Sequence, residues 1–304
     1  MGEVRGGGDF NVALAELERR FSGELAVAAI NLATGETVEH RADRVMPTAS
    51  VIKLAILCEV WRQAAEGRLD LGQRVVIGPG DAVLGSGVLR DFAPGLAPTV
   101  RDLGTLMVIV SDNTATNLLI DLVGGVGPVN ANARRLGLPD TTLHRRIDFG
   151  QIGRVASRFG ESTPRDLARL TAMLARGEVV DARASAEMVE IMRRQQYLDQ
   201  VPRYLNSNPH ADALEEGQEA WAACKTGMMP GTRADAGILH LPGGVEIAYA
   251  AMTDGGSDQS FAADNEGEVV NGIVGRLLVE HWWPGGPMPA WALLPGDVYG
   301  RLVG

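Results

Sequence analysis

Ser50-Val51-Ile52-Lys53 opens a strongly apolar stretch that continues to Ala65. Its periodicity predicts a helix over 50–65, with Thr48 or Ser50 as the cap and the Lys53 amine one turn from the Ser50 hydroxyl. Free backbone N–H groups at such a helix start would favour a developing anion near Ser50. Serine followed three residues later by lysine is a weak motif by itself, because a capped helix start with a lysine on its face has the same pattern.

Lysine is nearly absent from this sequence. Of its 28 basic residues only Lys53 and Lys225 are lysine, and all the others are arginine. Arginine keeps its proton at any working pH, whereas a lysine that is desolvated or near other cations can lose one and act as a general base. The two positions therefore indicate a chemical requirement that arginine does not meet.

Two more short motifs follow along the chain, Ser111-Asp112-Asn113 and Lys225-Thr226-Gly227. The first lies between two stretches of helical periodicity and the second in a predicted strand, which would place Ser111 and Lys225 across a cleft from Ser50. A lone Ser-Asp-Asn in mid-chain is more often a helix cap or a turn. The combination is more specific, since the three motifs together contain both lysines.

These three motifs in this order are a catalytic signature of class A β-lactamases and penicillin-binding proteins. The chain resembles that superfamily over about residues 25–283, and further landmarks lie at 85–87, 99–103, 111–119 and 162–164. The resemblance implies that Ser50 is the nucleophile, Lys53 its base and Ser111 the proton shuttle toward the leaving nitrogen. It implies an acyl-enzyme on Ser50, formed from a β-lactam or a related amide or ester.

The resemblance also implies how a substrate would be held. Asn113 would bind the substrate amide, and Lys225, Thr226 and Gly227 would bind a substrate carboxylate. The backbone N–H groups of Ser50 and Met228 would form the oxyanion hole. Arg233, on the approach to the next predicted strand, is a candidate second anchor for the carboxylate, with a surface arginine as the alternative.

One expected catalytic group is missing. Class A enzymes carry a glutamate in a long loop, where it activates the water that releases the acyl-enzyme, but here no Glu occurs between Glu66 and Glu161. The matching segment places Ile147 at the glutamate and Gln151 at the asparagine that helps to hold the water. Asp148 is the only carboxylate nearby, either as a substitute general base or as a loop cap and arginine partner. Deacylation is therefore expected to be slow or atypical.

The order of predicted elements indicates an α/β (α+β) fold. Predicted strands lie near both ends of the chain and predicted helices lie between them, so we expect an antiparallel sheet flanked by helices and built from 11–45 plus 195–283. An all-helical lobe over 46–194 would be inserted into it, as in the β-lactamase and transpeptidase fold, with a tail at 284–304. The irregular, arginine-rich stretch 138–162 is expected to be a long functional loop.

Composition narrows the partners. A net charge of −10 argues against nucleic acid and acidic membrane surfaces, which leaves a small molecule that carries an acyl bond and a carboxylate. Cys58 and Cys224 have no metal-ligand spacing, no phosphate- or metal-binding motif is present, and no cofactor is predicted. The beginning of the sequence lacks the pattern of a signal peptide, which predicts a cytoplasmic protein, although the mature form of a periplasmic or secreted protein would look the same.

Three functions remain open on this sequence. The first is a β-lactamase with an atypical water-activating group, and the second is an esterase, amidase, peptidase-like enzyme or acyltransferase that uses the same site. The third is a penicilloyl-binding module without turnover. Ser-His-Asp hydrolysis is disfavoured, because no G-x-S-x-G elbow is present and the five histidines lack a motif context.

Overall fold

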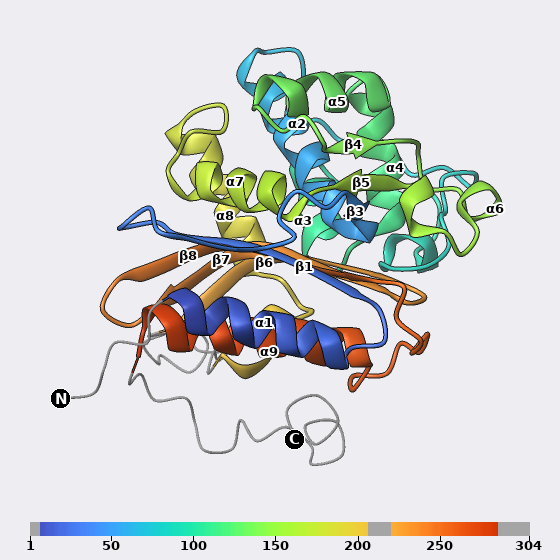
Figure 1. Cartoon of the computed structure of the whole chain (residues 1–304). Coiled ribbons are helices and arrows are strands. Elements are labelled where there is room, and N and C mark those ends of the chain that lie inside the picture. Colours follow the sequence, from blue (N-terminus) through green and yellow to red (C-terminus); the bar gives the residue numbers. More distant parts are fainter. Residues whose placement is uncertain (1–6, 206–219, 285–304) are drawn as a thin grey trace, which may run out of the picture.

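The computed structural model describes residues 7–205 and 220–284. Its centre is a five-stranded antiparallel sheet with the strand order β2-β1-β8-β7-β6 (Figure 1). The strands are β1 (Glu24–Asn31), β2 (Thr37–His40), β6 (Trp221–Met229), β7 (Thr232–Leu241) and β8 (Val245–Asp254). The pairing of β1 with β8 joins the two ends of the chain in one sheet, as predicted, and leaves β6 at an edge.

Two helices from opposite ends of the chain cover one face of this sheet. They are α1 (Gly7–Arg20) and α9 (Glu266–Trp282), and they lie side by side (Figure 1). Their apolar side chains share a core with Leu25 and Tyr249 of the sheet. Removing this surface from water, at about 25 cal/mol per Å², stabilises the layer.

Helices from the middle of the chain form the opposite side of the molecule (Figure 1). They share a second core, in which α2 is apolar around most of its circumference because it is buried along its length. They are α2 (Lys53–Ala65), α3 (Val100–Ile109), α4 (Asn113–Leu122), α5 (Val126–Arg135), α7 (Pro164–Ala175) and α8 (Ala182–Arg193).

The stretch 138–162 contains more regular structure than the predicted loop. Its strands β4 (Thr142–Leu143) and β5 (Gly160–Ser162) form a small sheet with β3 (Met46–Pro47), in the order β3-β5-β4. A single turn of helix, α6 (Phe149–Ile152), lies between β4 and β5. Elements of two to four residues are too short to produce a detectable period, which is why the sequence showed none.

The predicted helix over 50–65 is interrupted at its start. A 3-10 helix, η1 (Ala49–Ile52), precedes α2, and Ala49 has a left-handed backbone with φ of +42°. Neither predicted cap is realised, because Thr48 occupies the N-cap position without a side-chain cap bond and Ser50 lies inside η1. The turn that carries Ser50 is therefore set by tertiary packing and not by capping.

No helix within 7–205 and 220–284 has the length and apolar character needed to cross a bilayer. The predicted tail at 284–304 lies outside the described residues except for Pro284.

Candidate active site

Ser50 lies where η1 meets the edge strand β6. A Cβ atom at Gly227 would be 2.5 Å from the Thr48 carbonyl oxygen and 2.8 Å from the Ser50 nitrogen, so only glycine allows this approach of the two backbones. The left-handed conformation of Ala49 directly before Ser50 is strained for a residue with a side chain. Such strain is typical of functional turns that the surrounding structure holds in place.

Lys53 is completely buried and faces the Ser-Asp-Asn motif. Its Nζ lies 2.7 Å from the Ser111 carbonyl oxygen, 3.0 Å from Ser111 Oγ and 2.9 Å from Asn113 Oδ1. Burial lowers the pKa of Lys53 well below its usual value, and the charge on Lys225 lowers it further. A neutral amine has only two N–H donors, so the Ser111 hydroxyl, which can donate as well as accept, is the contact able to reverse when Lys53 loses its proton.

Ser111 has a left-handed backbone with φ of +55°, which directs its carbonyl and its hydroxyl to the same amine. The next residue, Asp112, caps α4 and accepts hydrogen bonds from the backbone N–H groups of Val88 and Leu89. A Cβ at Gly87 would lie 2.3 Å from Asp112 Oδ2. The Ser-Asp-Asn turn and the loop at 85–89 therefore form one rigid wall of the site.

Lys225 approaches from the sheet side. It is completely buried, and its Nζ donates to the Thr226 carbonyl oxygen at 2.6 Å. Burial lowers the pKa of Lys225 to about 7. Because β6 is an edge strand, backbone N–H and C=O groups on its outer side have no partner strand, and an extended substrate or an oxyanion can bind there.

A cavity of about 440 Å³ lies at Ser50, and neither Lys53 nor Lys225 is among its lining residues. Its lining includes Ser50, Ser111, Thr226 and Met228 from the predicted site. It also includes residues that the motif analysis did not single out for a role: Gly85, Ser86, Phe149, Gly153, Met229, Pro230 and Phe261. A volume of this size suits a small-molecule ligand.

Arg233 does not lie where the sequence interpretation placed it. Its side chain is buried on β7, and Nε donates to Glu268 Oε1 of α9 at 2.9 Å. Three further hydrogen bonds run to the carbonyl oxygens of Met229, Thr232 and Ser260. Four of the five Arg233 N–H donors are engaged inside the protein, so Arg233 connects sheet and helix, and neither a free carboxylate anchor nor a surface arginine describes its position.

Asp148 likewise departs from the role of a substitute base. It is exposed, its Oδ1 accepts from Gly150 N–H at the start of α6, and its Oδ2 accepts from the Gln151 side chain. Asp148 lines neither the cavity of about 440 Å³ nor a second, smaller chamber of about 40 Å³ at Ser50. The neighbouring residue, Ile147, lines that smaller chamber. The alternative of a loop cap fits this position.

Ile147 is held firmly against that chamber. Asn117 accepts from the Ile147 N–H and donates to its carbonyl oxygen, at 2.8 Å in both cases. Ile152 and Phe159 line the same chamber. The polar side chains in its lining are Ser50, Ser86 and Asn113, and none of them is a carboxylate that could activate a water.

The histidines are used elsewhere. The four within the described residues each lie within hydrogen-bond distance of a glutamate, in the pairs His40–Glu18, His144–Glu161, His240–Glu246 and His281–Glu36. None of them lines the cavity at Ser50. His210 lies outside the described residues.

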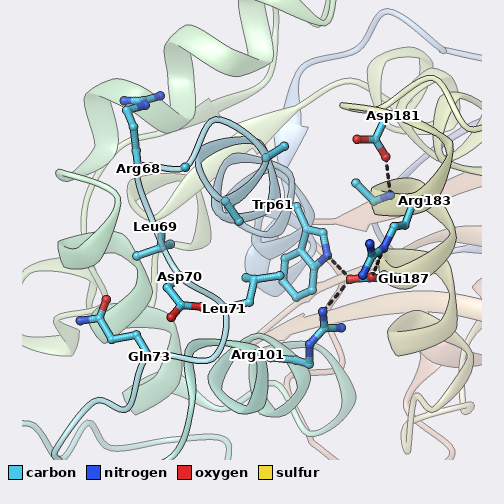
Figure 2. A pocket seen from close by; sticks show the side chains of 14 residues that line it. Trp61, Arg68, Leu69, Asp70, Leu71, Gln73, Arg101, Asp181, Arg183 and Glu187 are labelled. Carbon is cyan, nitrogen blue, oxygen red and sulfur yellow. Dashed lines mark hydrogen bonds and ion pairs between the residues drawn. The ribbon is translucent and has the colours of Figure 1, made fainter.

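A larger pocket, of about 690 Å³, lies at the far end of α2 (Figure 2). Its central carboxylate, Glu187, accepts from Trp61, Arg101 and Arg183, so its negative charge is compensated within the pocket wall (Figure 2). Its lining includes no serine, cysteine, lysine or histidine. Of these two pockets, the smaller cavity at Ser50 is the one that contains a candidate nucleophile.

A family model described as "Beta-lactamase enzyme family" matches residues 9–282. The chain belongs to this family. The predicted superfamily is thereby confirmed, as is the coarse prediction of a hydrolase at the level of the family. Among curated relatives, beta-lactamase L2 of Stenotrophomonas maltophilia is 32% identical over 66% of this chain and 61% of its own length. A beta-lactamase of Streptomyces fradiae is 30% identical over 88% of this chain and 84% of its own length.

Solved structures of the beta-lactamase fold superpose well on this family member. The beta-lactamase from Sphaerobacter thermophilus has a TM-score of 0.78 at 30% identity, covering 90% of this chain and 97% of that one. PBP-A has a TM-score of 0.76 at 26% identity, covering 90% and 95%. A mutant of PBP-A solved as an acyl-enzyme complex with penicillin G gives 0.77 at 26% identity, covering 92% and 98%. The predicted fold class is confirmed.

Proposed function

We propose that this chain is a serine acyl hydrolase of the β-lactamase type, which forms an acyl-enzyme on Ser50 and releases it slowly. The observation that carries the proposal is the buried Lys53 amine, in contact with Ser111, which lines the cavity together with Ser50. A buried amine with a lowered pKa can accept a proton at neutral pH, which is what activation of a serine hydroxyl requires.

The acylation step assigns one task to each group. Ser50 Oγ attacks the substrate carbonyl carbon and its proton passes to the neutral Lys53 amine. The resulting oxyanion is held by the N–H groups of Ser50 and Met228, each worth about 3 kcal/mol in comparable sites. As the bond to the leaving nitrogen breaks, Ser111 donates its proton to that nitrogen and takes one from Lys53. Lys53 is neutral again, and the acyl group remains on Ser50.

The small molecule is held by groups around this centre. Lys225 and Thr226, with Gly227 allowing the close approach of β6, are proposed to bind a carboxylate when the substrate has one. The Asn113 amide donates to the Leu84 carbonyl oxygen and accepts from Lys53, which leaves one N–H for the substrate. A β-lactam carries both an acyl bond and a carboxylate and is the first substrate to test.

Release of the acyl group is proposed to be the slow half of the reaction. Ile147 supplies no base at the position where class A enzymes carry glutamate, and the lining of its chamber contains no carboxylate. The acyl-enzyme complex of a PBP-A mutant with penicillin G shows that this fold can hold such an adduct. Slow turnover of lactams is also what an esterase or acyltransferase built on this site would show, so the second open function remains a candidate.

Intact-protein mass spectrometry over time tests the proposal. Incubation with penicillin G is expected to add the mass of one penicilloyl group on Ser50, with a lifetime of minutes or longer. Ser50→Ala should show no adduct, and Lys53→Arg should acylate at least about 10²-fold more slowly because arginine does not give up its proton. Absence of an adduct together with absence of β-lactam hydrolysis would contradict the proposal that β-lactams acylate Ser50.

A further inference from the structure

The cavity at Ser50 is walled by apolar side chains that the catalytic steps do not require. Phe149, Met228, Met229, Pro230 and Phe261 make up nearly half of its lining residues. The residues Phe149 and Phe261 are 38% and 63% exposed, although large apolar side chains are usually withdrawn from water. Exposed rings that gather around a nucleophile indicate a ligand that covers them.

Phe149 is held on the side of the cavity formed by the loop at 85–87. A Cβ at Gly85 would lie 3.1 Å from Cε2 of the Phe149 ring and 2.6 Å from Nδ2 of Asn113. The ring thus extends from α6 across to Gly85 and comes next to the amide expected to bind the substrate. Gly85 has φ of +95°, a conformation that favours glycine and leaves room for the ring.

Phe261 is held by a cation behind it. The guanidinium carbon of Arg233 lies 5.3 Å from the centre of the Phe261 ring, and Arg233 is itself fixed by Glu268. A cation–π contact of this kind orients a ring even where one face is open to solvent. The two phenylalanines are therefore positioned groups of the cavity, and the flexible side chains of Met228 and Met229 can adapt between them.

The cationic side of the cavity is weak by comparison. Lys225 is the single cation left for a carboxylate among the predicted site residues, since Lys53 faces the Ser-Asp-Asn turn and Arg233 is engaged with Glu268. Lys225 Nζ donates to a backbone carbonyl and has no exposed surface. Apolar contact therefore offers more recognition here than charge does.

We infer that this site selects acyl donors with an uncharged, apolar acyl group about the size of a phenyl ring, received by Phe149, Phe261 and the two methionines. The inference rests on the proposed acyl-enzyme at Ser50. With an aryl ester, the bond from Ser50 Oγ to the acyl carbon forms, the bond to the phenol oxygen breaks and the phenol leaves. Water then cleaves the Ser50 ester, giving the carboxylic acid and the free serine.

A series of p-nitrophenyl esters measures this selectivity. From acetate through butyrate and hexanoate, kcat/KM is expected to rise about threefold for each added methylene, and phenylacetate should be among the best substrates. Phe149→Ala and Phe261→Ala should each lower the ratio of the phenylacetate to the acetate kcat/KM roughly tenfold. Phe261→Leu, which keeps an apolar side chain, should retain most of that ratio and guards against a folding defect in the alanine variant.

Phe92→Ala is the matched control, because Phe92 is 56% exposed and lies outside the cavity lining. It should leave both esters unaffected. A flat ester series, or an equal loss for acetate and phenylacetate in the phenylalanine variants, would overturn the inference. If neither the esters nor penicillin G acylate Ser50, the proposed function itself is wrong. If all esters acylate Ser50 at equal rates, the proposed function stands and the inferred selectivity for apolar acyl groups is wrong.

Discussion

At the scale of single residues, the proposed slow release of the acyl group depends on Ile147. Ile147→Glu would place a carboxylate beside the chamber at Ser50, where it can activate a water. We expect the lifetime of the penicilloyl adduct to fall at least tenfold, as measured by mass spectrometry. Because Ile147 belongs to the core, we also expect a loss of about 2–3 kcal/mol of unfolding free energy in denaturant melts.

Ile147→Gln is the control for that substitution, since it adds a polar group of similar size without a base. Similar adduct lifetimes in the Glu and Gln variants would mean that the position does not activate water.

Lys225 predicts a pH dependence that separates substrate classes. Its pKa is lowered to about 7 by burial, so its positive charge is present below that pH and is lost as pH rises through it. For a penicillin, kcat/KM for acylation should therefore decline above about pH 7, up to tenfold per unit. For an uncharged ester this decline should be absent. Parallel profiles for the two substrates would refute a carboxylate-binding role.

The roles of some single residues could be predicted from the sequence, and those of others could not. Lys53 and Lys225 could be singled out because arginine cannot replace them chemically. Arg233 was a candidate anchor from its place near a predicted strand, with a surface arginine as the alternative. Its pairing with Glu268, 35 positions later on another element, could not be predicted, because no local spacing indicates such a pair. Phe149 and Phe261 carried no signal, because an isolated aromatic residue in a loop has the same pattern in a core and in a cavity.

At the scale of elements, the Arg233–Glu268 pair connects β7 to α9. Both side chains are almost fully buried. Arg233→Ala would leave the buried Glu268 carboxylate without its cationic partner, and burial already raises the pKa of Glu268. We expect a loss of about 3–5 kcal/mol in unfolding free energy, partly recovered in the double variant Arg233→Ala/Glu268→Ala. Unchanged stability with a KM increase restricted to carboxylate substrates would instead restore Arg233 as a substrate anchor.

The apolar periodicity of residues 50–65 predicted most of α2, and the order of predicted strands and helices predicted a sheet built from both ends of the chain. The break between η1 and α2 was not predicted, because the apolar pattern runs through it without interruption. It arises where Gly227 of β6 packs against the Ser50 backbone, a contact between residues 177 positions apart. Contacts of this range leave no trace in local patterns.

At the scale of the whole molecule, the site depends on how closely the sheet approaches the helical side. In Gly227→Ala the new methyl group would meet the backbone at Thr48 and Ser50, so β6 must move away. We expect acylation by penicillin G to slow about 10²-fold, the order expected for a displacement near 1 Å. Stopped-flow or quenched-flow acylation measures this effect.

Gly127→Ala is the matched comparison, because a Cβ there meets nothing within 4 Å on α5. It should keep normal acylation and raise stability by about 0.5–1 kcal/mol. Normal acylation in Gly227→Ala as well would show that the two halves of the site tolerate separation.

The lobe boundaries near 45/46 and 194/195 stay a prediction, which limited proteolysis of the folded protein can test.

The burial of both lysines has a consequence for chemical labelling. The sequence has no other lysine, and neither Nζ lies on a side chain with any exposed surface. Amine-directed reagents such as N-hydroxysuccinimide esters would therefore find the amino terminus as their only accessible amine on the folded protein. Each lysine label that accumulates would count an opening of the catalytic centre or of the whole fold, so the chain carries a built-in reporter of its own unfolding.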